Sequence, residues 1–168
     1  PALVLLVGPS GAGKSTFASR NFSGTEILSS DRARELLSDN PSDQGASTEA
    51  FRVVGLIANG RLKRRLMTVI DATNLRAASR SGYRRLAARY GIPTVTIAFD
   101  LPTDQYALHN RNRPDRVVDD YVITDQAERM RDALLVLPDE RYAALYVLRS
   151  PEEIAAAVIE RAASRGRA

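Results

Sequence analysis

The sequence predicts an α/β fold, a doubly wound parallel sheet of five strands with helices on both faces. Short apolar runs typical of buried strands alternate with longer segments of helical periodicity, which is the pattern of repeated β–α units. The first apolar run leads directly into a glycine-rich loop and a helix. With 168 residues, 44% of them apolar, the chain is long enough for one well-packed domain and short for two. We therefore expect residues 1–168 to form a single domain.

The first half of the chain is predicted to contain three strands and three helices. Apolar runs predict strands at 2–7, 25–30 and 67–70, and helices are expected after the glycine-rich loop and over 32–37 and 50–66. A polar surface loop is predicted at 38–45. Residues 47–49 are predicted to cap the helix over 50–66. The apolar face of that helix is expected to include Phe51, Val54, Leu56, Ile57, Leu62 and Leu66.

The second half continues the alternation. Strands are predicted at 93–99 and 143–148, and helices at 77–90 and 119–137. A further helix is expected to open at 100–103 and to extend to about residue 110. Gly91 is predicted to end the helix over 77–90 as a C-cap. Ser150 is predicted to cap a last helix, with Pro151 in its first turn.

Composition excludes several functional classes. There is no cysteine, so a disulfide framework, a thiolate metal site and a cysteine nucleophile are excluded. No apolar run approaches the length of a membrane span, and the start lacks the form of a signal peptide, so we expect a soluble cytoplasmic protein with no membrane partner. The net charge is +4, and nine basic residues lie between Arg61 and Arg89, where Asp71 is the only acidic one. This basic stretch is either a solvated surface or a surface that faces a polyanion.

The glycine-rich loop carries the most specific motif of the chain. Gly8, Gly13, Lys14 and Ser15 fit the phosphate-binding pattern G-x-x-x-x-G-K-[ST]. In this geometry, successive backbone N–H groups at the start of a helix point at phosphate oxygens. Lysine adds a positive charge for the β- and γ-phosphates, and serine a hydroxyl for Mg²⁺. The predicted nucleotide-binding residues are Gly8, Ser10, Gly11, Ala12, Gly13, Lys14, Ser15 and Thr16.

Acidic residues follow other predicted strands, at the sheet edge where α/β proteins bind ligands. Asp31 is either the N-cap of the next helix or a general base that accepts the proton of an attacking hydroxyl. Arg34 lies on the same helical face, as a phosphate clamp or as an ordinary surface arginine. Asp71 occupies the position of a Walker-B-like carboxylate, which would hold a water on Mg²⁺. Thr73 and Asn74 either contact ligand or shape the turn.

Asp100 ends a further strand at the same predicted edge. The segment 111–116 is polar and basic, and its position between two helices indicates a lid over about 102–125. Arg111, Arg113 and Arg116 belong to it, and a lid arginine can neutralise the charge that develops during phosphoryl transfer. His109 is the only histidine and is expected to be a helix surface residue.

Together these segments resemble a known family. The runs Gly8–Ala18, Ser29-Ser30-Asp31 with Arg34, Val69–Asn74 and Arg111–Arg116 are similar to those of the 5′-hydroxyl polynucleotide kinase family. The similarity is greatest to the kinase domain of bacterial polynucleotide kinase-phosphatases of RNA repair, and it covers nearly the whole chain. It implies a P-loop kinase-like fold with an arginine-bearing helical lid.

The resemblance also implies an activity, the transfer of a γ-phosphate from ATP or another NTP to the 5′-hydroxyl of RNA or DNA, at single-stranded or broken ends. It implies Mg²⁺ as cofactor and Lys14, Asp31, Arg34, Arg113 and Arg116 as catalytic residues, with Ser15 and Asp71 near the metal. The chain would then be the N-terminal module of a larger protein that also carries phosphatase and ligase modules. Acceptor bases are expected to stack near residues 41–60.

Other classes remain to be weighed against this one. A small-metabolite kinase, of the gluconate or shikimate type or a toxin-type nucleotide-sugar kinase, uses the same kind of phosphate loop, acid and lid. A GTP switch is disfavoured because the Asn-Lys-x-Asp guanine signature is absent. A motor ATPase is disfavoured because Asp71 is followed by Ala72 rather than by glutamate.

Overall fold

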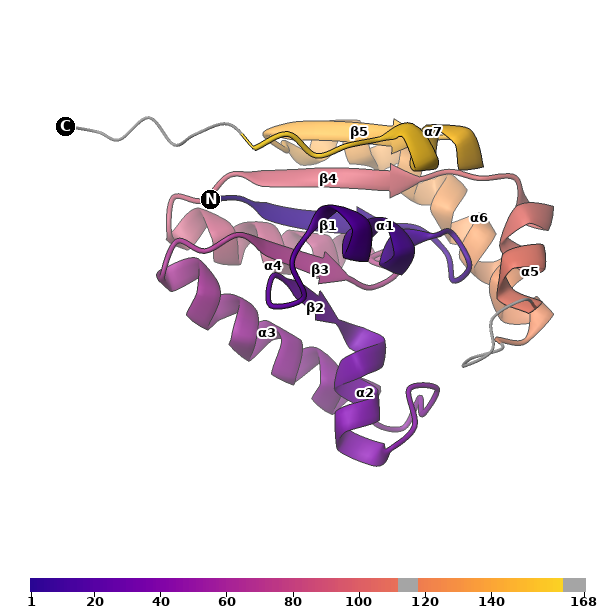
Figure 1. Ribbon diagram of the computed structural model, residues 1–168, viewed down its shortest axis with the longest axis horizontal. Coiled ribbons are helices and arrows are strands. Elements are labelled where there is room, and N and C mark those ends of the chain that lie inside the picture. Colours follow the sequence, from indigo (N-terminus) through magenta and orange to yellow (C-terminus); the bar gives the residue numbers. More distant parts are fainter. Residues whose placement is uncertain (112–117, 162–168) are drawn as a thin grey trace.

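The computed structural model describes residues 1–111 and 118–161 (Figure 1). Each of its strands and α-helices coincides with a predicted element, with boundaries shifted by a few residues at most, whereas the 3₁₀ turn at 137–140 has no predicted counterpart. The strands are β1 (Leu3–Val7), β2 (Ile27–Ser29), β3 (Thr68–Asp71), β4 (Thr94–Phe99) and β5 (Ala144–Leu148). The helices are α1 (Lys14–Asn21), α2 (Ser30–Ser38), α3 (Ser47–Lys63), α4 (Ala77–Arg89), α5 (Thr103–Arg111), α6 (Asp120–Val136), the 3₁₀ turn η1 (Leu137–Glu140) and α7 (Pro151–Ala156).

The strands form one sheet in the order β2-β3-β1-β4-β5, and every neighbouring pair is parallel. The predicted five-stranded parallel sheet is confirmed. Strand β1 lies at its centre, with Leu6 opposite Asp71 of β3, and Asp71 is in turn opposite Ser29 of β2. Because parallel strands end at the same edge, the residues that follow β1, β2 and β3 meet there.

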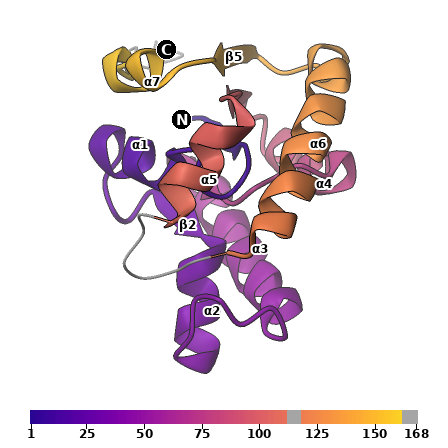
Figure 2. The ribbon, with the colours of Figure 1, turned by 90° about the vertical axis from the view of Figure 1, so that its right-hand side faces the viewer.

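Helices cover both faces of the sheet, α1 and α7 on one and α3, α4 and α6 on the other (Figure 2). Strand β1 packs against both helical layers. Leu3 and Leu5 pack in the core beside α3 and α4, whereas Val4 and Leu6 pack in the core beside α1. Every residue of β1 is buried as a result, which explains why its sequence is a continuous apolar run rather than an alternating one.

Helix α3 buries a narrower stripe than predicted. Its buried residues are Ala50, Val54, Ala58 and Leu62, one for each turn. The predicted apolar face is therefore right for Val54 and Leu62 and wrong for the residues on either side of this stripe. Those exposed residues are Phe51, Leu56 and Ile57, together with Leu66 beyond the helix.

The sequence predicts three helix caps, and the structure shows the groups at each of these helix ends. Helix α3 begins at Ser47 after Ala46 and has no side-chain cap, so the predicted cap at 47–49 is wrong. Two other predicted caps are confirmed. Gly91 follows α4 with φ +62°, and the Ser150 hydroxyl accepts a hydrogen bond of 3.1 Å from the Glu153 N–H at the start of α7. None of the helices in the described ranges is long and apolar enough to span a membrane.

A buried ionic cluster fixes α4 against η1 and the turn after β3. The Arg80 side chain is fully buried and is paired with Glu140, which also accepts a hydrogen bond from the Tyr142 hydroxyl. Arg80 donates two further hydrogen bonds, of 2.9 and 2.8 Å, to the carbonyl oxygens of Asn74 and Leu75. Arg80 therefore stabilises the backbone that leads out of β3.

We predict that Glu140→Gln destabilises the protein by roughly 3–5 kcal/mol at neutral pH, because it leaves the buried Arg80 charge without its counter-ion. Chemical denaturation followed by circular dichroism measures this loss. Glu35→Gln is the matched control, since Glu35 pairs with Arg32 on the surface. A surface pair contributes at most about 1 kcal/mol, so equal losses in the two variants would contradict the prediction.

The same cluster should make stability depend on pH. Burial alone would raise the pKa of Glu140, but hydrogen bonds from Arg80 and Tyr142 and nearby positive charge lower that pKa below its usual 4.5. A depressed folded-state pKa contributes stability that is complete above the unfolded pKa and is lost as the pH falls through the folded value. The wild type should therefore lose more stability than Glu140→Gln between about pH 5 and about pH 3.

Candidate active site

The phosphate loop connects β1 to α1 at the carboxyl edge of the sheet. Gly8 starts it with no room for a side chain, since a Cβ there would lie 3.1 Å from the Cβ of Phe99 and 3.2 Å from its carbonyl oxygen. Gly13 ends it with φ +84°, a conformation that L side chains rarely adopt. Both glycines of the motif are thus required by the backbone, and the loop leads into α1 with Lys14 and Ser15 in its first turn.

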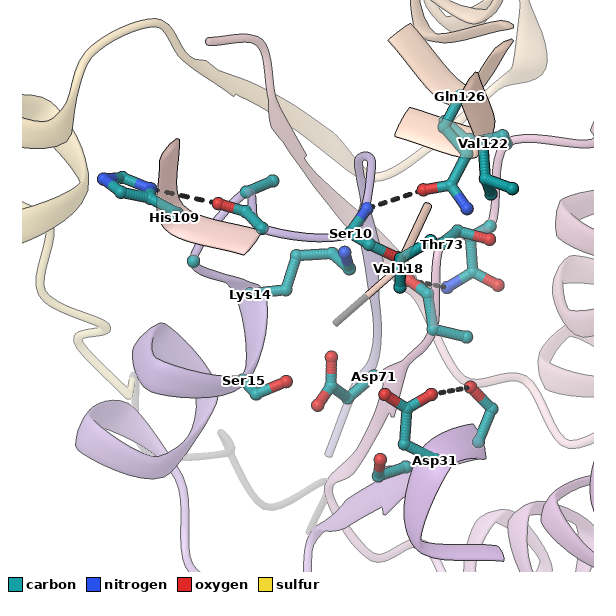
Figure 3. A pocket seen from close by; sticks show the side chains of 18 of the residues that line it. Ser10, Lys14, Ser15, Asp31, Asp71, Thr73, His109, Val118, Val122 and Gln126 are labelled. Carbon is teal, nitrogen blue, oxygen red and sulfur yellow. Dashed lines mark hydrogen bonds between the residues drawn. The ribbon is translucent and has the colours of Figure 1, made fainter. Parts of the chain in front are cut away.

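Other side chains contact the loop in this structure (Figure 3). The Lys14 ammonium donates hydrogen bonds of 2.8 and 2.7 Å to the carbonyl oxygens of Gly8 and Pro9. The N–H of Ser10 donates a 2.7 Å bond to Oε1 of Gln126 on α6. These contacts hold the lysine and one loop amide in place, and a phosphate would compete for them.

His109 and Gln126 reach the loop from the two helices that border the predicted lid. Nδ1 of His109, on α5, lies 3.0 Å from the carbonyl oxygen of Gly11, so Nδ1 carries the proton and donates it to that oxygen. His109, which is expected to be a helix surface residue, is half-buried and contacts the loop. Helix α5 is itself anchored by the buried Tyr106, whose hydroxyl donates to the Phe99 carbonyl oxygen at 2.9 Å. Burial raises the pKa of Tyr106 to about 12, so it stays protonated.

Ser15 and Asp71 form the candidate magnesium position. Asp71 is the last residue of β3 and is buried, and its carboxylate and the Ser15 hydroxyl point toward one another (Figure 3). Mg²⁺ prefers oxygen ligands and keeps several waters, and it typically takes one or two protein groups together with substrate phosphates. A hydroxyl and a carboxylate beside a phosphate loop fit this requirement.

Asp31 and Arg34 lie on α2, which begins directly after β2. Ser29 is the N-cap of α2, because its hydroxyl accepts the N–H of Arg32 at 3.3 Å. The capping role considered for Asp31 is thus filled by Ser29. Asp31 is paired with Arg34, whose side chain is almost entirely buried and also donates a 2.9 Å bond to the Pro41 carbonyl oxygen. Arg34 is therefore a fixed partner of Asp31 and not a surface arginine.

The residues after β3 shape the turn. The Asn74 side chain is buried, has φ +49° and donates a 2.8 Å hydrogen bond to the carbonyl oxygen of Leu6 in β1. The carbonyl oxygen of Thr73 accepts the N–H of Gly8 at 3.0 Å. Both residues thereby tie this turn to the start of the phosphate loop, which supports the turn-shaping alternative for Asn74.

One cleft of about 1210 Å³ contains most of the predicted site. Its lining includes the phosphate loop from Ser10 to Thr16, with Asp31, Arg34 and Asp71. Asp100 lies outside this lining, and its carboxylate is 3.9 Å from Nε of Arg149. The cleft lining also contains residues that the sequence analysis did not single out for a role there: Arg76, Gln126, Arg129 and Ile154.

The structure describes the predicted lid over about 102–125 only in part. Helices α5 and α6 precede and follow residues 112–117 in the chain and lie in front of the strand ends (Figure 2). Arg111, at the end of α5, is exposed and pairs with Asp120 at 2.5 Å. The predicted catalytic residues Arg113 and Arg116 lie outside the described residues.

Comparison with known proteins assigns the chain to a family. A family model described as an AAA domain matches residues 3–137, well over half of the chain. The chain belongs to this AAA domain family. None of the curated proteins compared with the chain matches it.

Several solved structures have the same fold as this chain. A chain of the Pnkp1/Rnl/Hen1 RNA repair complex is 22% identical with a TM-score of 0.69, and the match covers 80% of this chain and 45% of that one. A gluconokinase from Sinorhizobium meliloti 1021 is 18% identical with a TM-score of 0.58, covering 92% and 86%. The APS kinase CysC of Mycobacterium tuberculosis is 20% identical with a TM-score of 0.52, covering 80% and 97%. The fold is thus confirmed as P-loop kinase-like, and the chain spans less than half the length of the RNA repair chain.

The Gln126 contact leads to a prediction about nucleotide binding. Gln126→Glu would place a carboxylate on the Ser10 N–H, where it bonds the amide more strongly and repels phosphate. We expect the Kd for ATP to rise about tenfold, which corresponds to about 1.4 kcal/mol. Isothermal titration calorimetry measures it.

Gln105→Glu is the control for this variant, because Gln105 lies on α5 outside the cleft lining and adds the same charge. The same Kd in both variants would show that Gln126 has no part in phosphate binding.

Proposed function

We propose that the chain is an ATP-dependent kinase that transfers the γ-phosphate of an NTP to the 5′-hydroxyl of an RNA or DNA end. The observation that carries this proposal is the pairing of Asp31 with a buried arginine in the same cleft as the phosphate loop. A carboxylate held by an arginine combines a base for a hydroxyl with a cation for a phosphate close to that hydroxyl. A nucleotide with a free 5′-hydroxyl and a 3′-phosphate offers both groups.

On the donor side, the loop amides and Lys14 hold the β- and γ-phosphates. Ser15 and Asp71 would hold Mg²⁺. When bound, the ion would supply positive charge that offsets the negative charge developing on the donor phosphates. In this structure the Lys14 ammonium donates to the loop carbonyl oxygens of Gly8 and Pro9, and a donor phosphate would take over these hydrogen bonds.

On the acceptor side, the oxygen of the 5′-hydroxyl attacks the γ-phosphorus, and Asp31 takes the proton of that hydroxyl. The bond from the γ-phosphorus to the β-phosphate oxygen breaks, and ADP leaves. Arg34 orients Asp31 and contacts the phosphate 3′ of the accepting nucleoside. Arg113 and Arg116 of the lid contact the donor phosphates after closure.

The domain organisation is part of the same proposal. The likeness to the RNA repair complex, of which the chain spans 45% of the matched polypeptide, supports a module of a larger RNA repair protein. Phosphatase and ligase modules would then be its covalent partners.

A small-metabolite kinase is the second candidate. The observation that favours it is the gluconokinase likeness, which covers 92% of this chain and 86% of that enzyme. Its acceptor would be one small hydroxyl compound bound beside Asp31.

Transfer of labelled γ-phosphate from ATP with Mg²⁺ tests the proposal. The acceptors are a short single-stranded oligonucleotide with a 5′-hydroxyl and the same oligonucleotide already phosphorylated at its 5′ end. We expect label on the first and none on the second. Label on a small metabolite and on neither oligonucleotide would overturn the proposal in favour of the metabolite kinase.

Variants of the two central residues are predicted to separate binding from chemistry. Asp31→Ala should lower kcat by about 10²- to 10⁴-fold, the contribution of a general base, with nearly unchanged nucleotide affinity. Lys14→Ala should lower both kcat and the affinity for nucleotide, because the ammonium of Lys14 binds the donor phosphates. Asp43→Ala is the control, since Asp43 is a carboxylate of the α2–α3 loop outside the cleft lining. Full turnover in Asp31→Ala would mean that another group is the base.

A further inference from the structure

We infer that the cleft contains a subsite for a second acceptor nucleotide, in which Arg76 binds a backbone phosphate and Phe51 stacks on a base. This inference rests on the proposed function and extends it from a reacting 5′ end to the strand behind it. It assigns to Arg76 and Phe51 a role in selecting polynucleotides over single nucleotides.

The cleft is larger than a typical small-molecule site and continues past Asp31. Its volume of about 1210 Å³ exceeds the roughly 300–1,000 Å³ typical of small-molecule sites. The lining extends from Ile154 of α7, past the phosphate loop and Asp31, to Phe51 of α3. In-line transfer places the acceptor on the opposite side of the γ-phosphate from the donor nucleotide. The part of the cleft beyond Asp31 is therefore the acceptor part, and it continues past Arg34.

Arg76 adds a further cation to the lining of the cleft. It follows the turn after β3, is exposed, and lines the cleft. Within residues 1–111 and 118–161, its guanidinium has no hydrogen-bond or ion-pair partner. The next arginines along the chain, both in α4, differ, since Arg80 and Arg84 are both bound to Glu140. Arg76 is thus a cation that faces the cleft with its donors available for an anion, and a phosphate takes arginine as a bidentate partner.

Phe51 adds an exposed aromatic ring to the lining of the cleft. It lies in the second turn of α3, is 43% exposed, and lines the cleft next to the hydroxyl-bearing residues Ser42 and Ser47. Leu56 of the same helix is more exposed but lies outside the lining. An aromatic ring on an otherwise polar wall offers a face for any base, which suits a site that reads no sequence.

The arrangement matches the chemistry of a nucleic-acid strand. Arg34 is assigned to the phosphate directly 3′ of the accepting nucleoside, so a second cation in the lining of the same cleft serves the next phosphate. Arg129 of α6 lines the cleft as well, but it is paired with Asp125 at 2.8 Å. An acceptor of the gluconate type has no base, so it needs no stacking face.

The test compares two acceptors, a nucleoside 3′-monophosphate and a single-stranded 5′-hydroxyl hexanucleotide. For the hexanucleotide, Arg76→Ala should raise KM roughly tenfold, the loss of one hydrogen-bonded charge. Phe51→Ala should raise it by about 5- to 100-fold, the range for one base–aromatic stack. For both variants the ratio of the hexanucleotide KM to the monophosphate KM rises, while kcat for the hexanucleotide changes little.

Binding gives a readout that does not depend on turnover. Fluorescence anisotropy with the labelled hexanucleotide should show the same rise in Kd. In Arg76→Ala the slope of log K against log salt should fall by about 0.7, the value for one phosphate of a single strand. Phe51→Ala should leave that slope unchanged, because the ring carries no charge.

Two controls come from the same helices. Arg89→Ala removes an exposed arginine at the opposite end of α4, and Leu56→Ala removes an exposed apolar side chain of α3 outside the cleft. Both should leave hexanucleotide KM, Kd and salt slope as in the wild type.

The outcomes distinguish a failure of the subsite from a failure of the proposed function. Equal effects of Arg76→Ala and Arg89→Ala, or equal effects of Arg76→Ala on both acceptors, would overturn the subsite while leaving the kinase proposal intact. A wild type that phosphorylates neither nucleic-acid acceptor but does phosphorylate a small metabolite would overturn the proposed function, and the subsite with it.

Discussion

The parallel pairing of β1 with β3 is the constraint on which the rest of the site depends. It places Asp71 opposite Leu6, and the two connections continue to interact beyond the strands, where Gly8 donates to Thr73 and Asn74 donates to Leu6. Since β2 pairs with the other side of β3, the start of α2 reaches the same edge. The loop, the candidate magnesium position and the proposed base thus follow from one arrangement of three strands.

A buried charge supports this arrangement from behind. Arg80 holds the carbonyl oxygens of Asn74 and Leu75, and Glu140 compensates its charge. Burying an ion pair is costly, and a well-packed apolar pair of the same volume is often at least as stable. The pair here satisfies carbonyl oxygens that an apolar side chain would leave without donors. Its contribution is to the shape of the turn next to the phosphate loop.

The polar groups of the site already have partners inside the protein. Lys14 contacts the loop carbonyls, the Ser10 amide contacts Gln126, and Asp31 contacts Arg34. Such contacts keep each group oriented before substrates bind, and a phosphate would replace those of Lys14 and Ser10. Gln126 and His109 connect the loop to α6 and α5, the two helices that border the predicted lid.

The sequence by itself determined the local elements and the motif. Apolar periodicity predicts each strand and helix, and the spacing of Gly8, Gly13 and Lys14 predicts the phosphate loop, because these signals depend on neighbours a few residues apart. Only the tertiary structure decided which distant groups meet. Gln126 contacts an amide 116 residues away, and of the basic residues near Arg80 the structure directs Arg76 to the cleft and Arg80 to a buried pair. Periodicity states that a side chain faces one side of a helix, but the partner on that side is fixed by the packing of the whole chain. The same reason accounts for Phe51, which the pattern predicts as core and the packing of α3 leaves in the cleft.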